Sequence, residues 1–167
     1  MRIIIALFIS LSFPLVSHAE KIFGHVIEVT SGDKLTLLDT SLATHKVRLI
    51  GIDAPESSQP YSKESQAKLF SLIHGKKVVV ITNNRSHSNV LIGKVLLNKK
   101  DINLEQIKHG MAWTSYNYAK ELSYVDQESY VNSQLQAKNK KLGLWHDSCP
   151  IEPWMYRQKC CPKYAKH

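Results

Sequence analysis

Short stretches in which hydrophobic and polar residues alternate run through the N-terminal and central parts of the chain. Alternation with a period of two predicts β-strands that bury one face. Turn-forming residues separate neighbouring stretches, such as Ser31-Gly32-Asp33-Lys34 after the first, so the first three strands are expected to form an antiparallel meander. The expected strands are residues 22–29, 35–37, 46–52, 77–82 and 90–97.

Three other segments have the spacing of helices, and a glycine stands at or just beyond the end of each. The expected helices are residues 62–74, 102–109 and 121–140. A helix between the third and fourth strands of a five-stranded barrel is the order of the OB-fold, which commonly binds oligonucleotides. We therefore expect an α+β protein, an OB-fold five-stranded antiparallel β-barrel with three α-helices.

Residues 1–19 have a different pattern, which predicts a signal peptide. A short basic start, Met1-Arg2, precedes a mostly apolar run, and Ser17-His18-Ala19 is a small-x-small cleavage site. The apolar run is too short and too interrupted to favour a permanent membrane span. We expect the mature chain to begin at Glu20 and to be exported, to the periplasm or beyond, without a stable membrane span.

The mature chain has the length of one domain and a strongly basic charge. The whole sequence carries 22 Lys and Arg against 14 Asp and Glu, a net charge of +8, and loss of Arg2 leaves 21 against 14, or +7. Such an excess attracts polyanions: nucleic acid, a phospholipid surface or a cell-wall polymer. Charge alone does not choose among them, and solubility is the simplest alternative.

All three cysteines lie in a C-terminal tail, residues 147–167, which follows the expected domain at residues 20–146 and reads as a loop. Cys149 can pair with Cys160 or Cys161, and either pairing leaves one thiol over. The spacing fits neither a zinc site nor a redox motif.

Three carboxylates and one guanidinium stand close together in the sequence, and they are the main candidates for chemistry. Asp33 lies in the first turn, while Arg48, Asp53 and Glu56 lie within residues 47–56. The four side chains converge if the two strands and the following turn meet. Carboxylate oxygens suit a hard cation such as Ca²⁺, and a guanidinium suits a phosphate. The combination indicates metal-assisted attack on a phosphodiester.

The order and spacing of these motifs resemble those of the staphylococcal-nuclease-like (thermonuclease) family over most of the mature chain. The stretch V-R-L-I-G-I-D-A-P-E at residues 47–56 is close to the family's signature. Other segments that resemble the family are residues 26–38, 61–65, 104–112, 142–145 and 150–157. The resemblance implies a nuclease of DNA, RNA or both with Ca²⁺ as its cofactor, and we expect it to act as a monomer. It also implies that Asp33 and Asp53 ligate Ca²⁺ directly, together with the backbone carbonyl of Ala54.

The resemblance assigns the remaining roles to four other residues. Glu56 would position or deprotonate the attacking water, and Arg48 would hold the scissile phosphate. Tyr116 and Tyr118 match the family's nucleotide-contacting tyrosines. These roles describe a hydrolase, a phosphodiesterase or endonuclease.

One catalytic position departs from the family pattern. A second arginine is expected just before the fifth strand, and Val90 stands there instead. Arg85 and His87, in the preceding loop, are candidates to replace it. Two alternatives to an active nuclease therefore stay open: a catalytically impaired homologue that binds nucleic acid, and an exported protein-interaction domain. Lys34 also departs from the usual threonine, and its side chain either competes with Ca²⁺ or adds to the basic surface.

Overall fold

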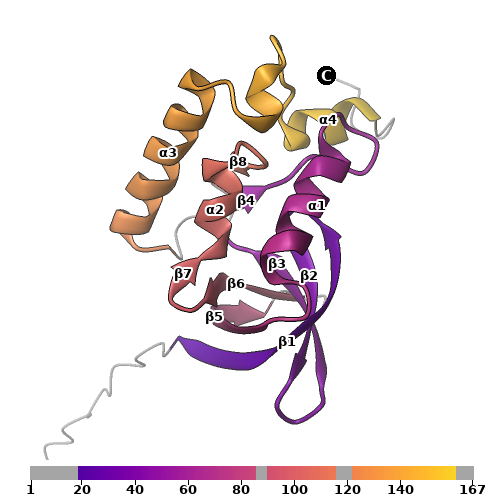
Figure 1. Ribbon diagram of the computed structural model, residues 1–167, viewed down its shortest axis with the longest axis vertical. Coiled ribbons are helices and arrows are strands. Elements are labelled where there is room, and N and C mark those ends of the chain that lie inside the picture. The colour runs from indigo at the N-terminus through magenta and orange to yellow at the C-terminus, as the bar shows by residue number, and fades with distance from the viewer. Residues whose placement is uncertain (1–18, 86–89, 116–121, 161–167) are drawn as a thin grey trace, which may run out of the picture.

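The computed structural model describes residues 19–85, 90–115 and 122–160, and the side chains of all of these except residues 83–85, 159 and 160. Five strands form a closed barrel at one end of the molecule, and the helices gather at the other end (Figure 1). The barrel strands are β1 (Glu20–Ser31), β2 (Lys34–Asp39), β3 (Thr44–Leu49), β5 (Lys77–Arg85) and β6 (Val90–Leu97).

The barrel is closed by a parallel pairing. β1 pairs antiparallel with both β2 and β5, β2 pairs with β3, and β5 pairs with β6. The remaining edges, β3 and β6, run parallel, with Arg48 opposite Ile92 and Lys46 opposite Val90. This register places the end of β3, which carries the candidate guanidinium, beside the start of β6.

Alternate residues of the strands fill the barrel, as the sequence pattern predicts. The side chains of Val26, Leu37, Leu49, Val80 and Val95 are fully buried. Each such side chain contributes about 1.5–3 kcal/mol on burial, so a register shift that turned one strand over would be costly. The pattern therefore determines which residues of each strand face outward, where a ligand can reach them.

Four helices and several short elements cover one end of the barrel. The helices are α1 (Ser62–Ile73), α2 (Ile102–Lys108), α3 (Tyr124–Asn139) and α4 (Pro153–Cys160). A 3₁₀ helix, η2 (Gly143–His146), precedes α4, and the short strand β7 (Lys100–Asp101) extends the sheet at β6. Side-chain caps begin α2 and α3: Asp101 accepts from the amide of Leu104, and Ser123 from that of Asp126.

The predicted OB-type α+β fold is confirmed, with three differences in detail. The barrel is mixed and not wholly antiparallel, because β3 and β6 close it in parallel. The third predicted strand ends at Leu49, where Gly51 turns the chain with φ 75° into a separate strand, β4 (Ile52–Asp53). The tail predicted as a loop contains α4, the fourth helix, which Pro153 begins.

Two further predictions concern the tail and the membrane. Cys149 is exposed and has no disulfide partner among the described side chains, but those of Cys160 and Cys161 lie outside the described part of the chain, so the disulfide pairing stays a prediction. Within the described ranges, no helix is long and apolar enough to cross a bilayer. The signal peptide at residues 1–18 and the domain boundary at 146 also stay predictions.

Candidate active site

Asp33 lies in the turn between β1 and β2, at the end of the barrel that faces the helices. The Ser31 hydroxyl donates to its Oδ1 over 2.7 Å, and its backbone carbonyl accepts from the amide of Leu49 over 2.8 Å. The second bond ties the turn directly to the end of β3. Asp33 is 2% exposed, so the turn presents a buried carboxylate beside Arg48.

Gly32 lets this turn approach the helices closely. A Cβ built on Gly32 would lie 1.7 Å from the hydroxyl of Ser65 in α1 and 3.0 Å from the Cβ of Ala54. No larger residue fits without moving the turn away from α1. The Gly-Asp pair is therefore more than a turn former, because the glycine sets the distance between Asp33 and the segment that carries Asp53.

Asp53 is held by a small second sheet. β4 pairs antiparallel with β8 (Trp113–Thr114), and the amide of Ser115 donates to the carbonyl of Gly51 over 2.9 Å. The side chain of Asp53 is 1% exposed. A buried charge is costly unless it is paired, and here two arginines provide the partners.

Arg48 bridges the two buried aspartates. Its Nε lies 3.5 Å from Oδ2 of Asp33, and its Nη2 donates to Oδ1 of Asp53 over 3.2 Å. The Arg48 side chain is 30% exposed, so one edge of the guanidinium stays open to a ligand. The strand and the following turn thus meet as the sequence predicts.

Glu56 follows Asp53 in a tight turn. The turn is closed by the amide of Gln59, which donates to the Glu56 carbonyl, and by the Gln59 side chain, which accepts from the Glu56 amide over 3.1 Å. The carboxylate of Glu56 is 31% exposed and, among the described side chains, accepts a hydrogen bond from Arg157. It is accessible to water, which a general base requires.

Arg157, on α4, completes the cluster. Its Nη2 donates to Oδ2 of Asp53 over 2.7 Å, its Nη1 lies 3.3 Å from Oδ1, and Nη1 also donates to Oε1 of Glu56. The hydrogen bond with Asp53 is the main cause that raises the pKa of Arg157, with Glu56 also contributing against the effect of burial. Sequence reasoning placed Arg157 only in a tail resembling that of bacterial family members, and assigned it no role.

Burial dominates the electrostatics of Asp33. It raises the pKa of this carboxyl, against the hydrogen bond from Ser31 and the charges of Lys34 and Arg48, while Asp53 adds to the rise. A cation placed between Asp33 and Asp53 would therefore stabilise the ionised form of Asp33. The donor set, carboxylate oxygens, has the chemistry that Ca²⁺ prefers.

The described side chains nevertheless do not form a ready metal cage. No group of three or more His, Cys, Asp or Glu side chains within the described ranges is placed to hold an ion. The reason is visible in the contacts: both oxygens of Asp53 and one of Glu56 are turned toward arginines. A metal at Asp33, Asp53 and the carbonyl of Ala54 fits in chemistry, and requires Arg157 to give up its bonds to Asp53.

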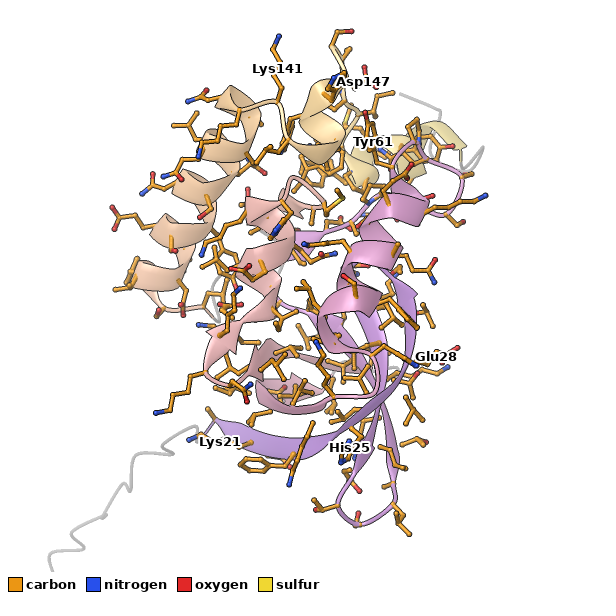
Figure 2. The ribbon with its side chains drawn as sticks, in the orientation of Figure 1. Lys21, His25, Glu28, Tyr61, Lys141 and Asp147 are labelled. Carbon is orange, nitrogen blue, oxygen red and sulfur yellow. The ribbon has the colours of Figure 1, made fainter. Side chains whose placement is uncertain are left out.

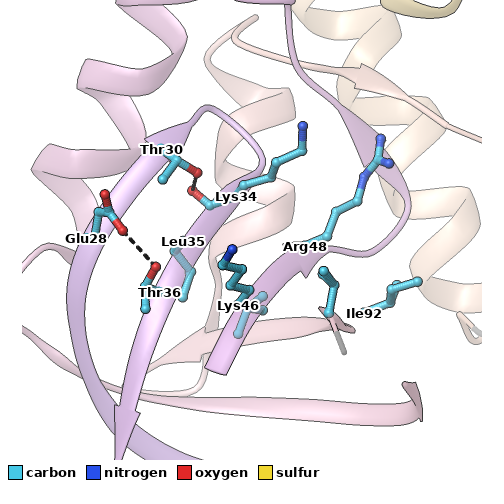
Figure 3. A pocket seen from close by; sticks show the side chains of 10 residues that line it. Glu28, Thr30, Lys34, Leu35, Thr36, Lys46, Arg48 and Ile92 are labelled. Carbon is cyan, nitrogen blue, oxygen red and sulfur yellow. Dashed lines mark hydrogen bonds between the residues drawn. The ribbon is translucent and has the colours of Figure 1, made fainter. Parts of the chain in front are cut away.

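A pocket of about 520 Å³ opens beside Arg48 on the outer surface of β2 and β3 (Figure 3). Lys34 and Arg48 extend from the neighbouring strands into this region, and Lys46 lies on the same side. The Lys34 side chain is exposed and lines this pocket, which answers the question that the sequence left open: it adds to the basic surface. The pocket wall also contains Glu28, which accepts a hydrogen bond from Thr36 over 2.9 Å.

The predicted site residues thus fall into two groups. Asp33, Arg48, Asp53 and Glu56 come together, and Ala54 is buried beside them. Tyr116 and Tyr118 lie outside the described residues, as do His87 and the side chain of Arg85. Val90 lines the pocket, so the position of the expected second arginine is described and carries no charge.

Comparison with known proteins shows the family to which the chain belongs. Residues 46–147 match the family described as staphylococcal nuclease homologue. A protein of Haemophilus influenzae named an uncharacterized endonuclease is 35% identical over 140 residues, 84% of this chain and 75% of that protein. An Escherichia coli protein of the same name is 32% identical over 141 residues, 83% of this chain and 86% of that protein.

A plant relative matches a shorter part. A staphylococcal-like nuclease of Arabidopsis thaliana is 32% identical over 113 residues, which are 68% of this chain and 33% of that protein. The family match at residues 46–147 includes the signature stretch at residues 47–56, in keeping with the resemblance that the sequence motifs indicate. The chain belongs to the family of staphylococcal nuclease homologues.

Proposed function

We propose that this chain is an exported, Ca²⁺-dependent nuclease that hydrolyses phosphodiester bonds of DNA, RNA or both with water as the nucleophile. The observation that carries the proposal is the convergence of Asp33, Arg48, Asp53 and Glu56 from a turn, a strand and a second turn. Family membership and the names of the relatives support hydrolytic nuclease activity. Export rests on the signal peptide pattern of residues 1–19.

Arg48 binds and polarises the phosphate. Its guanidinium is held by two buried carboxylates and is open on one edge toward the pocket. A planar guanidinium can donate two hydrogen bonds to a phosphate. Because its position is already fixed, it needs little reorganisation as negative charge grows on the phosphoryl oxygens. Arg48 therefore stabilises the transition state more than the ground state.

Glu56 accepts a proton from the attacking water. The oxygen of water forms a bond to phosphorus, its proton passes to the Glu56 carboxylate, and the opposite phosphorus–oxygen ester bond breaks. The leaving oxygen takes a proton from solvent, so the products are one hydroxyl end and one phosphate monoester end. Glu56 suits this role because it is partly exposed and lies beside a turn that fixes its backbone.

The buried aspartates would hold the metal. Asp33 and Asp53, with the carbonyl of Ala54, would ligate Ca²⁺, which when bound would neutralise charge on a phosphate oxygen. Lys34 and Lys46 line the neighbouring pocket and attract the flanking phosphates of a strand. The protein is expected to act as a monomer.

The test is cleavage of single-stranded DNA and RNA by the mature protein with millimolar Ca²⁺ or with EDTA. Glu56→Gln is the matched control, since it keeps the size of the side chain and removes the base. We expect Ca²⁺-dependent cleavage that falls by about 10²–10⁴ in the control. Absence of cleavage by folded wild-type protein would sink the proposal. An N-terminus at Glu20 in protein recovered from the periplasm or medium would support export, and an intact Met1 would contradict it.

A second candidate function rests on Val90. The pocket wall has valine where the family resemblance implies a transition-state arginine. A protein that bound single strands with strong salt dependence and did not cut them would be a catalytically impaired binding module. The same assay distinguishes the two functions.

A further inference from the structure

The pocket beside Arg48 lacks a second guanidinium on its β6 side. The β3–β6 register places Val90 opposite Lys46 and Ile92 opposite Arg48, so both β6 side chains on this wall are aliphatic. Lys94, further along the same strand, is engaged elsewhere, because its Nζ lies 2.6 Å from Asp126 and 3.6 Å from Asp101. No residue described on β6 can therefore supply the missing charge.

Arg157 contacts Asp53, which Arg48 also contacts, and in addition Glu56. Among the described side chains, only Arg48 and Arg157 form ion pairs with Asp33, Asp53 or Glu56. The two arginines share one carboxylate: Arg48 and Nη1 of Arg157 both donate to Oδ1 of Asp53, and Nη2 of Arg157 donates to Oδ2. Arg157 is 40% exposed, more than Arg48, so a substrate can reach its guanidinium.

The helix that carries Arg157 is fixed on the domain at several points. The hydroxyl of Tyr156 lies 3.0 Å from that of Ser58 and donates to the Ser58 carbonyl over 3.1 Å. The side-chain amide of Gln59 donates to the carbonyl of Ile151, just before α4. Both anchoring partners belong to the turn that carries Glu56, so α4 and the catalytic turn form one unit.

Apolar packing adds to this anchorage. Pro153 is buried, and Trp154 packs against the cluster of Trp113 and Trp145. Trp113 pairs with Asp53 across β4 and β8. Figure 1 shows α4 beside α1 at the helical end of the molecule, and Figure 2 shows Tyr61 and Asp147 at this same end, far from Lys21 and His25 of the barrel.

We propose that Arg157 is the second catalytic guanidinium of this nuclease, supplied by the C-terminal helix in place of an arginine at position 90. This inference rests on the proposed function and extends it. Arg157 exchanges its bonds to Asp53 for the scissile phosphate when substrate and Ca²⁺ arrive. Arg48 and Arg157 then donate to phosphoryl oxygens from two sides, while the Glu56 carboxylate is released to accept the proton of water.

The opposite role would be a latch. A guanidinium that stayed on Asp53 and Glu56 would block both the metal and the base, and its removal would increase activity. The two roles predict opposite signs for the same substitution, so one variant separates them.

The first experiment compares three variants of the full mature protein in Ca²⁺. We expect Arg157→Ala to lower kcat by about 10³, at the lower end for an arginine that acts in phosphoryl transfer. Arg157→Lys should retain more of the wild-type kcat than Arg157→Ala, because an ammonium group keeps the positive charge. It should stay below the wild type, because it cannot donate two parallel hydrogen bonds as a guanidinium does. Gln158→Ala, on the exposed side of α4, is the matched control and should leave kcat unchanged.

Chemical rescue separates catalysis from a merely structural role. Free guanidinium at concentrations well below those that unfold the protein should raise kcat of Arg157→Ala several-fold and leave Glu56→Gln unaffected. Urea unfolding checks that Arg157→Ala is folded. Loss of activity in a folded variant that neither lysine nor guanidinium restores would overturn the proposal, and so would equal or higher activity of Arg157→Ala.

A binding measurement tests the same contact without turnover. In a Glu56→Gln host with Ca²⁺, binding of a single-stranded oligonucleotide is measured by fluorescence anisotropy across salt concentrations. Adding Arg157→Ala should lower the slope of log K against log salt by about 0.7, the loss of one phosphate contact. Lys77→Ala, which removes an exposed charge at the start of β5, should leave the slope unchanged. An unchanged slope with Arg157→Ala would overturn the proposal.

The outcomes for the two proposals are distinguishable. Wild-type protein that cuts nucleic acid and loses this activity with Glu56→Gln, but not with Arg157→Ala, would keep the proposed function and reject the role of Arg157. Wild-type protein that does not cut would reject the proposed function itself.

Discussion

Arg157 and Asp53 are separated by 104 positions in the sequence, and their side chains meet with Nη2 donating to Oδ2 over 2.7 Å. The Asp53 carboxylate therefore binds both Arg48, on a strand of the barrel, and Arg157, on the C-terminal helix α4. Neither aspartate of the site is held by its local segment alone. Substitutions around the site should show how much each of these contacts contributes to activity and stability.

Asp53→Asn should abolish metal-dependent cleavage and destabilise the protein moderately. The amide keeps the shape but loses the charge that pairs with Arg48 and Arg157. Both arginines are partly exposed and can return to water, so the free energy of unfolding should fall by about 1–2 kcal/mol. Urea titration gives the stability and a cleavage assay gives the activity. Retained cleavage would contradict the assignment of Asp53.

Asn103→Leu should be more destabilising, although Asn103 is outside the site. Its buried Nδ2 donates to the carbonyls of Ile50 and Gly93 over 2.9 and 3.2 Å, and its Oδ1 accepts from the amide of Val95 over 3.0 Å. Leucine leaves buried backbone groups without partners, at about 1–3 kcal/mol each. We expect a loss of about 3 kcal/mol in urea unfolding. A decrease in the free energy of unfolding no larger than that of a surface substitution would show that water replaces the hydrogen bonds of Asn103.

Gly32→Ala should lower activity by displacing Asp33. The added methyl group would meet the Ser65 hydroxyl, which donates to the carbonyl of Met111 over 2.6 Å and cannot simply turn away. Gly32→Ala combined with Ser65→Gly removes the obstructing side chain and should recover part of the activity. Equal activity of the two variants would mean that another contact sets the position of the turn.

Lys46→Ala should weaken binding of single strands without changing kcat. Lys46 lines the pocket and forms no ion pair among the described side chains, so its charge is available to a phosphate. The slope of log K against log salt should fall by about 0.7. Anisotropy titrations in EDTA measure this slope without cleavage. An unchanged slope would mean that the nucleic acid binds to another surface of the protein.

Asp39 should make stability depend on pH in the acid range. Its carboxylate lies 2.7 Å from Nε2 of His45 and also accepts from Ser41 and the amide of Ala43. These bonds, the one with His45 first, lower its pKa in the folded protein. Because the folded pKa lies below the unfolded value, the stabilisation is present above about pH 4 and is lost as the pH falls through the folded pKa.

Urea unfolding between neutral and acid pH tests this dependence. The free energy of unfolding of the wild type should fall more steeply below about pH 4 than that of Asp39→Asn, which has no proton to gain. Parallel curves for the two proteins would show that Asp39 makes no net contribution through its charge.

Much of the barrel could be predicted because its signal is local. Alternation in residues 90–97 and turn residues at 31–34 specify strands and their faces, and the predicted and observed bounds of β6 agree. The parallel closure of β3 and β6 is not local, because it depends on how the whole sheet curls. Periodicity in either strand alone contains no information on it.

The site divides in the same way. The proximity of Arg48, Asp53 and Glu56 could be predicted, because all three lie within a stretch of nine residues and this short spacing limits how far apart they can be. Arg157 lies in a tail, residues 147–167, that contains three prolines and three cysteines and shows no helical pattern of hydrophobic residues that would place its side chain. Only the tertiary contacts of Tyr156 and Trp154 show which way its helix docks. The nucleotide-contacting roles of Tyr116 and Tyr118 stay predictions.

The docking of α4 has a further consequence for the timing of assembly. When the polypeptide is synthesised from its N-terminus, the stretch from Asp33 to Glu56 is present long before residue 157 follows. A chain that is interrupted in between, or trimmed by a protease after η2, would keep the barrel and lose one of its two guanidinium groups. Activity would then depend on the presence of α4, and a single proteolytic cut between η2 and Arg157 would abolish the contribution of this helix irreversibly.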